Sequence, residues 1–406
     1  MAEKQNTPEI RFEGFTDPWE QRKLGEFGSV AMCKRIYKEQ TSEQGDVPFF
    51  KIGTFGADPD AFISNELFDY FKRTYPYPTP GTLLISAAGS IGRVVEYQGE
   101  KAYFQDSNIV WLEHDHRLNN TFLKPLYSQI EWGLEGSTIK RLYNKDLLSA
   151  EVTIPGSGEQ KEIGRFFAKL DDLITLHQRK HEKLCTVKKS MLDKMFPKPG
   201  ETEPEIRFEG FTDPWEQRKL GELLLFQNGF NGSSESFGSG IPLISVMDVL
   251  DDEFITHETV RGKARLNYEE ASRYCVEYGD VLFQRSSENQ EDAGTSNVYL
   301  DQHVPSAFGG FVIRGKKVDE YNPIFIKYLL GSSFIREQIT HRAQGAQHIN
   351  VSQDTLAGVV LLMPSMREQE AVGLVFLHLA NLITLHQRKL DLLKNMKKSL
   401  LDKMFV

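Results

Sequence analysis

Two stretches of the chain repeat apolar residues at a seven-residue spacing, which predicts two long amphipathic helices. The repeating positions are Ile163, Leu170, His177, Leu184 and Met191 in the first stretch, and Val372, Leu379, His386, Leu393 and Leu400 in the second. Ser157 with Gln160, and Ser365 with Glu368, form capping-box patterns at the two starts. The first helix must end before Pro197. We assign 157–198 and 365–406 to these segments, and about 38 helical residues make a rod of about 55 Å.

Two such rods in one chain bury their apolar seams most economically against each other, as an antiparallel coiled coil under a pseudo-two-fold axis. Both seams are imperfect, because polar residues interrupt them. His177 and His386 occupy the third repeating position of their helices. We hypothesise that these two histidines form a polar pin that sets the helix register. The alternative is two partly solvated histidines.

Short β-rich runs separated by glycine-containing turns fill the segments that precede the two helices. The runs span 47–56, 81–97 and 101–113 in the first segment, and 241–250, 279–288 and 308–315 in the second. Each segment then closes with a glycine-led stretch of equal length, at 136–155 and 345–364. We therefore predict an α+β fold with two mixed α/β domains at 1–156 and 199–364, separated by the two long helices.

The chain contains two copies of one unit. The string PEIRFEGFTDPWEQRKLGE stands at 8–26 and again at 204–222, and LITLHQRK stands at 173–180 and at 382–389. KSMLDKMF at 189–196 returns as KSLLDKMF at 398–405. Identical ends around different middles describe a frame that presents two different modules. The apolar residues of the repeated head predict a packing device that seats each module: Phe12, Phe15, Trp19 and Leu24, with their copies Phe208, Phe211, Trp215 and Leu220.

Composition places the chain among ordinary globular proteins with two or three domains. It has 406 residues, of which 40% are apolar and 26% charged. The longest apolar stretch, 371–385, is too short to span a membrane, and the first residues lack a secretory signal. The three cysteines, Cys33, Cys185 and Cys275, show neither disulfide-framework nor zinc spacing. We expect a cytoplasmic protein without a membrane segment.

The net charge of −9 shows that phosphate neutralisation alone does not drive any binding of nucleic acid. The two middles are acidic, and the two helical tails are mildly basic. If DNA is the ligand, other subunits must supply much of the backbone electrostatics.

The repeated head RFEGFTDPWEQRKLGE, the closing segments GSTIKRL and GAQHINV, and the helical LITLHQRK together resemble the specificity subunit of a type I DNA restriction-modification system. The resemblance covers nearly the whole chain. It implies that each middle is a target recognition domain for one half of a bipartite double-stranded DNA sequence. It also implies that the paired helices set the spacer and dock two methyltransferase subunits, which restriction/translocase subunits join. Adenine-N6 methylation and restriction then belong to those partners, with their S-adenosylmethionine, ATP and Mg, and this chain carries no cofactor.

Base edges are read by Arg, Lys, Asn, Gln, Ser and Thr side chains on exposed loops. The loop candidates of the first middle are Ser86, Ser90, Arg93, Lys140, Arg141 and Asn144. Those of the second middle are Gln284, Arg285, Ser286, Ser287, Gln344, Gln347, His348 and Asn350. For each of them the alternative is a solvated turn residue, and Lys140 and Arg141 favour phosphate over bases. Two modules at a fixed spacing suit half-sites about 34 Å apart on one face of the duplex.

Motifs for an enzyme are missing from the sequence. FGSG at 237–240 and YNPIF at 321–325 are accidental matches to methyltransferase motifs, and no GxxxxGK[ST] phosphate loop occurs. We predict a non-catalytic chain with no metal site. The alternative from a different class is a scaffold or regulator whose tandem modules bind DNA or protein without modification partners.

Overall fold

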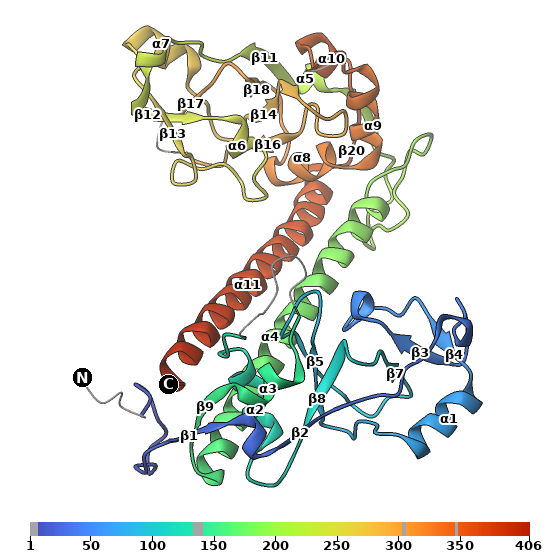
Figure 1. The fold of residues 1–406 in the computed structure, drawn as a ribbon. Helices are drawn as coiled ribbons and strands as arrows, with labels where there is room; N and C mark the ends of the chain where they lie inside the picture. Colours follow the sequence, from blue (N-terminus) through green and yellow to red (C-terminus); the bar gives the residue numbers. More distant parts are fainter. Residues whose placement is uncertain (1–6, 133–140, 303–305, 346–347) are drawn as a thin grey trace. The chain divides into compact units, whose positions relative to one another are not determined.

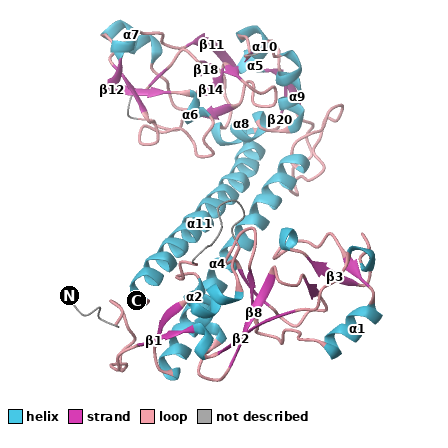
Figure 2. Cartoon of the chain, in the orientation of Figure 1, coloured by secondary structure: helices cyan, strands magenta, loops and turns pink. Residues whose placement is uncertain are grey.

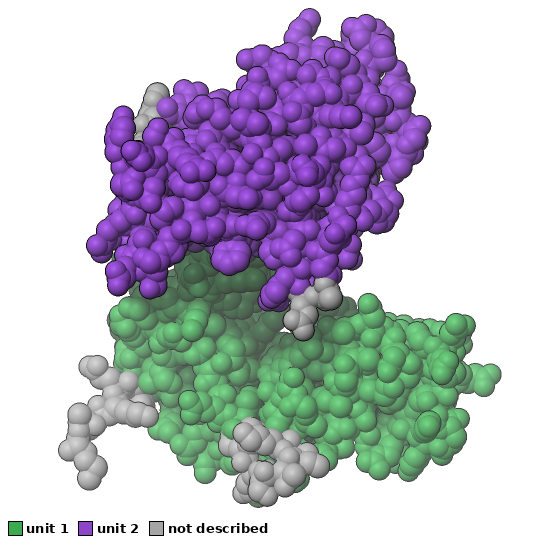
Figure 3. All heavy atoms as spheres, turned by 90° about the horizontal axis from the view of Figure 1, so that it is seen from above, with its two compact units in different colours: residues 1–178, 388–406 green, residues 179–387 purple. Residues whose placement is uncertain are grey.

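The computed structural model describes residues 7–132, 141–302, 306–345 and 348–406 (Figure 1). Two predicted site residues, Lys140 and Gln347, lie outside the described residues. The chain divides into two compact units (Figure 3). Unit 1 comprises residues 1–178 and 388–406, and unit 2 comprises residues 179–387. Each unit therefore contains one module, the first half of the long helix that follows that module, and the second half of the other long helix.

We call the domains predicted at 1–156 and 199–364 module 1 and module 2. Module 1 is built on a four-stranded sheet with the order β2-β8-β5-β6 and a three-stranded sheet with the order β4-β3-β7. In the second sheet, β3 runs antiparallel to β4 and parallel to β7. The strands are β1 (Glu20–Lys23), β2 (Gly28–Met32), β3 (Val47–Phe50), β4 (Phe62–Ile63), β5 (Leu83–Ser86), β6 (Val94–Glu96), β7 (Tyr103–Phe104), β8 (Ile109–His114) and β9 (Glu151–Ile154). The helices are α1 (Asn65–Thr74), α2 (Asn120–Tyr127) and α3 (Asn144–Ser149).

Module 2 repeats this topology, with the sheet orders β11-β18-β14-β16 and β13-β12-β17. Its strands are β10 (Glu216–Lys219), β11 (Leu224–Asn228), β12 (Phe237–Ile244), β13 (Gly262–Ala264), β14 (Val281–Gln284), β15 (Ser286–Ser287), β16 (Ser296–Val298), β17 (Ala307–Phe308), β18 (Val312–Lys317), β19 (Ile349–Asn350) and β20 (Val360–Met363). Its helices are α5 (Leu220–Leu223), α6 (Val246–Val249), α7 (Tyr268–Tyr274), α8 (Pro323–Leu330), α9 (Ser333–Arg342) and α10 (Gln353–Ala357). The prediction of two mixed α/β domains on one scaffold is confirmed.

The register of the central sheets gives a residue-by-residue equivalence between the modules. Ile85 pairs with Val110 in module 1, and Phe283 pairs with Ile313 in module 2. The central strands, β5 and β8 in module 1 and β14 and β18 in module 2, consist mostly of buried residues, so strand position and core position coincide there. The helix that follows β8 or β18 begins in both modules at an asparagine cap, Asn119 for α2 and Asn322 for α8.

The two long helices are α4 (Ser157–Lys194) and α11 (Met366–Met404), drawn green and red in Figure 1 and cyan in Figure 2. In unit 1 the start of α4 and the end of α11 share one core, so the two segments run antiparallel there. In unit 2 the end of α4 and the start of α11 share another. The predicted antiparallel pairing is thus confirmed within each unit.

The predicted capping boxes are wrong in detail. In α4, Ser157 is already helical, and the side chain of Gln160 accepts from Asn119 N at 3.0 Å and donates to the carbonyls of Arg117 and Pro155. In α11, Ser365 does cap Glu368 N at 3.4 Å, but the Glu368 carboxylate does not return to Ser365. Both side chains instead join the helix to other parts of the chain, which gives them a tertiary role that the local pattern does not reveal.

Candidate nucleic-acid interface

In module 1, the turn between β5 and β6 carries three of the predicted site residues. Ser86 is buried, and its hydroxyl accepts from Arg93 N at 2.9 Å and donates to the Ser90 carbonyl. Ser90 and Arg93 are exposed, and Arg93 also donates to the carbonyl of Gly56 at 3.1 Å. Burial removes Ser86 from direct contact with bases, and its hydrogen bonds shape the turn that presents Ser90 and Arg93.

A second loop of module 1 lies against that turn. Arg141 forms an isolated β-bridge with Ala88, and its guanidinium donates to the Ser107 carbonyl at 3.0 Å. Ser107 has φ of 47°, a left-handed conformation that a serine adopts only at a cost. Asn144 is exposed at the first position of α3. The fold therefore brings Arg93, Arg141 and Asn144 to one cluster of loops, and their contact with DNA stays a prediction.

In module 2, the corresponding candidates lie on the short ribbon β15-β19. Ser286 pairs with Asn350 and Ser287 with Ile349, while Gln344 and Asn350 exchange two backbone hydrogen bonds. Gln344, His348 and Asn350 are exposed, and Arg285 is partly exposed. The ribbon thus places Ser286 and Ser287 beside Asn350 and Ile349, and the contact of these candidates with DNA stays a prediction.

Two candidates of module 2 are enclosed. Gln284 and Ser287 are each 6% exposed. The Gln284 amide donates to the Ser286 carbonyl at 3.0 Å, and the Ser287 hydroxyl accepts from Asn289 N at 3.1 Å. These hydrogen bonds stabilise the ribbon.

A polar hollow of about 470 Å³ lies beside this ribbon. Three predicted residues line it, Arg285, Gln344 and Asn350. The hollow also includes residues that the sequence analysis missed, among them Asn228, Arg342 and Gln353. Arg342 ends α9 and Gln353 begins α10, so only the fold reveals that they meet Arg285. Arginine, glutamine and asparagine in one hollow match the donor and acceptor pattern of base edges.

Comparison with known proteins agrees with this geometry. Residues 16–186 match the family described as the type I restriction modification DNA specificity domain. A putative type I restriction enzyme specificity subunit of Haemophilus influenzae is 52% identical over 152 residues. Over these residues the chain is similar to type I restriction specificity subunits. The Haemophilus match covers 37% of this chain and 40% of that relative's own length.

Longer but weaker similarities extend over the second copy. A type I restriction enzyme specificity subunit of Methanocaldococcus jannaschii is 21% identical over 330 residues, which cover 79% of this chain and 75% of that protein. The structure of a type I restriction-modification S subunit from M. genitalium superposes with a TM-score of 0.64 at 16% identity, and covers 98% of this chain and 99% of that one. The whole chain therefore has the fold of that specificity subunit.

The frame of the chain is built from buried and partly buried hydrogen bonds that occur in both copies. Arg11 donates twice to the Glu159 carboxylate, at 2.8 and 2.7 Å, and Trp19 donates to it at 3.2 Å. Arg207 and Trp215 make the same contacts with Glu368, at 2.7, 2.8 and 3.4 Å. The hydrogen bond to Glu159 raises the pKa of Arg11, since a buried carboxylate favours the charged guanidinium. The predicted seating role of the head is supported by these contacts.

The tails complete the cores. Phe405, at the end of the second copy, packs on Trp19, Phe122 and Phe167 of unit 1, with ring centroids 6.2, 5.6 and 6.0 Å away. Phe196, at the end of the first copy, packs in unit 2 on Trp215, Phe325 and Phe376 at 6.3, 5.6 and 5.6 Å. Each module is therefore closed by the tail of the other copy.

The two helix histidines are partly exposed, His177 in the α4 part of unit 1 and His386 in the α11 part of unit 2. Both take part in interactions within the structure. The proposal that they pin the register stays a prediction.

All three cysteines are free, and burial raises the pKa of Cys33 to about 12, which keeps its thiol protonated. Among the described residues, no cluster of His, Cys, Asp and Glu has the make-up of a metal site. No helix in the described ranges combines the length and the apolar character needed to cross a membrane.

Proposed function

We propose that this chain is the DNA-recognition subunit of a type I restriction-modification complex, in which each module reads one half of a bipartite target. The observation that carries this proposal is the contrast between a duplicated frame and two modules whose loops differ. At equivalent positions the two modules carry different side chains: Arg141, paired with Ala88, stands where module 2 has Asn350, paired with Ser286. Arg285 likewise stands where module 1 has Ala87. Different side chains at one place read different bases.

The chain itself supplies recognition, and its partners supply catalysis. Its acidic balance leaves the phosphate backbone to other subunits, because salt-dependent affinity comes from cationic contacts. We infer that methyltransferase subunits modify adenine-N6 within the target, and that restriction/translocase subunits cleave DNA. The names of the relatives, as specificity subunits of type I restriction enzymes, support this division.

The long helices offer two identical docking surfaces. Leu173 and Leu176 are 46% and 45% exposed on α4, and their copies Leu382 and Leu385 are 43% and 46% exposed on α11. Leucines three residues apart lie on one face of a helix. The same exposed apolar pair in both units supports two docked methyltransferase subunits, since a homologous surface in each copy binds one partner of the same kind.

The first experiment is to co-express the chain with its methyltransferase partner and to map methylated adenines across a host genome by single-molecule sequencing. We expect one two-part motif with a fixed gap. Arg285→Ala should relax the sequence of one half-site only, by about 2 kcal/mol per lost base contact, and Arg93→Ala should relax the other. Arg367→Ala, which removes an exposed arginine outside the loops, is the matched control. A stable complex that methylates nothing would favour the scaffold alternative.

The docking surfaces are tested by stoichiometry. Leu173→Asp with Leu176→Asp should reduce the methyltransferase subunits per chain from two to one, and Leu382→Asp with Leu385→Asp should do the same. The control is Leu392→Asp, because Leu392 is 67% exposed on α11 but lies outside the repeated string. Native mass spectrometry of the purified complexes gives the ratio. Two bound subunits in both double variants would reject these surfaces.

A further inference from the structure

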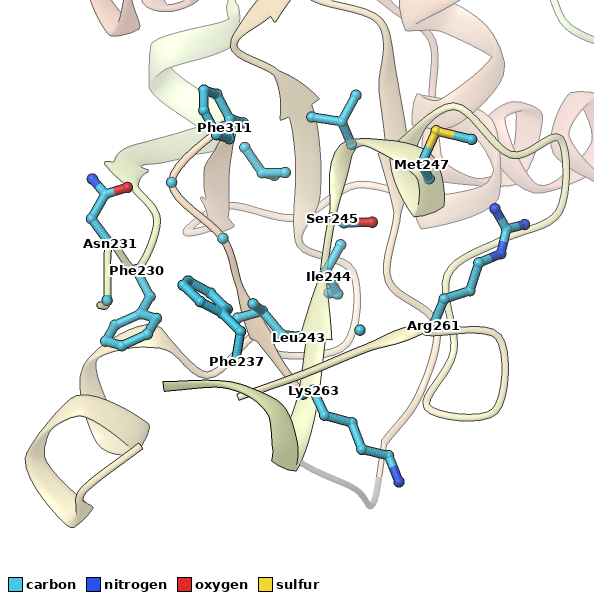
Figure 4. Close-up of a pocket in the computed structure, with 17 residues that line it drawn as sticks. Phe230, Asn231, Phe237, Leu243, Ile244, Ser245, Met247, Arg261, Lys263 and Phe311 are labelled. Atoms are coloured by element: carbon cyan, nitrogen blue, oxygen red, sulfur yellow. The ribbon is translucent and has the colours of Figure 1, made fainter. Parts of the chain in front are cut away.

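Module 2 contains an apolar pocket of about 900 Å³ that module 2's predicted base-reading residues do not explain. Figure 4 shows Phe311 and Phe237 on one side of it, and Met247 and Arg261 on the opposite side. Phe311, Met247 and Phe237 are 71%, 61% and 42% exposed. Large apolar side chains that line one hollow and stay open to solvent mark a binding site, because their exposure contributes nothing to folding.

The chain holds Phe311 in place through its backbone and leaves the ring outside. Val312 N donates to the Gly309 carbonyl at 2.9 Å and closes a tight turn, with Phe311 next to its end. Arg285 N donates to the Phe311 carbonyl at 2.9 Å, and Gly309 N donates to the Ile244 carbonyl at 2.9 Å. A Cβ at Gly310 would lie 1.7 Å from Asn231 Oδ1, so the turn approaches its neighbour closely. The aromatic ring is therefore presented on a preorganised support.

The pocket continues into the loops of the candidate DNA interface. Besides its backbone bond to Phe311, Arg285 donates from its guanidinium to the Gly310 carbonyl at 3.3 Å. Gly310 and Phe311 line the apolar pocket, and Arg285 lines the polar hollow. One residue thus joins the two cavities. A ligand in contact with Arg285 has Phe311 as its next neighbour.

The charge of the pocket favours an anionic aromatic ligand. Arg261 and Lys263 line it from the segment at β13. Arg261 is paired with Asp251 and Asp248, so Lys263, which makes no ion pair within the described ranges, supplies the positive charge for a ligand. Aromatic rings beside cations are the combination that binds single-stranded nucleic acid, where rings stack on bases and cations meet phosphates.

We propose that this pocket holds one unstacked base of the bound DNA and that the Phe311 ring stacks on it. This inference rests on the proposed function and extends it. A duplex has no free base to offer, so the bound DNA must be unstacked at one position of the module 2 half-site, which favours sequences that unstack easily. The pocket then adds specificity through deformability, beyond the hydrogen bonds of Arg285 and its neighbours.

Module 1 has no aromatic ring at the position of Phe311, which makes the two half-sites unequal. Ala87 N donates to the Asn108 carbonyl at 2.8 Å, as Arg285 N donates to the Phe311 carbonyl, so Asn108 stands where module 2 has Phe311. The residues before it are Asp106 and Ser107, where module 2 has two glycines. We therefore expect an unstacked base only in the half-site that module 2 reads.

The test uses the complex with its methyltransferase on the target that methylation mapping defines. 2-Aminopurine replaces each purine of the module 2 half-site in turn, and permanganate probes each thymine. One position should show an unstacked base, and Phe311→Ala should abolish that signal and weaken specific binding about ten-fold. Phe311→Trp should retain both. Tyr268→Ala should change neither, since Tyr268 is 90% exposed in the same module but does not line the pocket.

Specific binding of the wild-type complex, with every base stacked or with a signal that survives Phe311→Ala, would overturn the inference and leave the proposed function intact. Loss of methyltransferase binding in Phe311→Ala without DNA would assign the pocket to a protein partner and also overturn it. A wild-type complex with no sequence-specific binding would overturn the proposed function itself.

Discussion

Trp19 and Trp215 occupy the same place in the two units, and each donates to a buried glutamate. The interiors of the two modules are different. Trp111 on β8 of module 1 corresponds to Arg314 on β18 of module 2, because each follows the residue paired with Ile85 or Phe283. Trp111 donates to Glu113 at 2.9 Å, whereas Arg314 is buried against Asp280 at 2.6 Å.

This difference separates two kinds of constraint. Frame residues must fit the tail of the other copy, so the two copies keep the same side chains at the same contacts. Module residues need only fill one interior, and a buried aromatic ring or a buried ion pair serves that purpose on the same strands. The frame is therefore expected to respond symmetrically to mutation, and the modules are not.

The largest effect should come from the tail phenylalanines. Phe405→Ala should destabilise unit 1 and Phe196→Ala unit 2, each by about 4 kcal/mol, because a ring that fills a core leaves a cavity. Hydrogen exchange of amides in each unit during denaturant titration measures the two losses separately. Equal destabilisation of both units by either variant would contradict the assignment of each tail to one core. Phe311→Ala is the control, since its ring is exposed.

The next effect tests the module interior. Asp280→Ala should cost module 2 about 3 kcal/mol, because it leaves the Arg314 charge buried without its partner. The variant also removes the acceptor for Lys317 N and Glu277 N. Asp280→Leu combined with Arg314→Leu should recover much of this loss, since apolar residues of similar size often replace a buried ion pair. Hydrogen-exchange protection of the β14 and β18 amides measures the stability of module 2 in each variant. A double variant as unstable as Asp280→Ala would show that the lost backbone hydrogen bonds to Asp280 dominate.

The sequence predicts the frame, which is the repeated heads and long helices, more completely than it predicts the candidate nucleic-acid interface. Repetition reveals the head, the helices and their pairing, and alternation of apolar residues with glycine turns reveals the strands. It does not reveal that Gln160 and Glu368 bond across the fold, because their spacing from a serine matches a local cap equally well. It also misses Arg342 and Gln353, which meet Arg285 only through the packing of α9 and α10. Burial of Ser86 and Gln284 is likewise a tertiary property.

Two lysines at matching helix positions show how module environments diverge. Lys124 on α2 donates to the Glu96 carboxylate at 3.0 Å. Lys327 stands at the same place after the asparagine cap of α8. Within the described ranges its ammonium donates only to a backbone carbonyl, that of Asp252, at 2.7 Å. The ammonium nitrogen also lies 4.3 Å from the centre of the Phe254 ring. Burial, reinforced by the nearby charge of Lys188, lowers the pKa of Lys327 to about 7.

A pH-dependent effect follows from this lowered pKa. Between pH 7 and the ordinary lysine value of about 10.4, the unfolded chain binds a proton at Lys327 that the folded module does not, so module 2 gains stability as the pH rises through this range. Below about pH 7 both states are protonated, so the pH dependence ends and the cost of burying the charged ammonium is present in full. Lys327→Met should flatten the curve of unfolding free energy against pH for module 2 and stabilise it near pH 7. Lys124→Met, which lies in unit 1, should leave the module 2 curve unchanged. Hydrogen-exchange protection of the α8 amides from pH 6 to 10, corrected for intrinsic exchange, measures the slope of unfolding free energy against pH. An unaltered slope in Lys327→Met would show that Lys327 stays charged in the folded module.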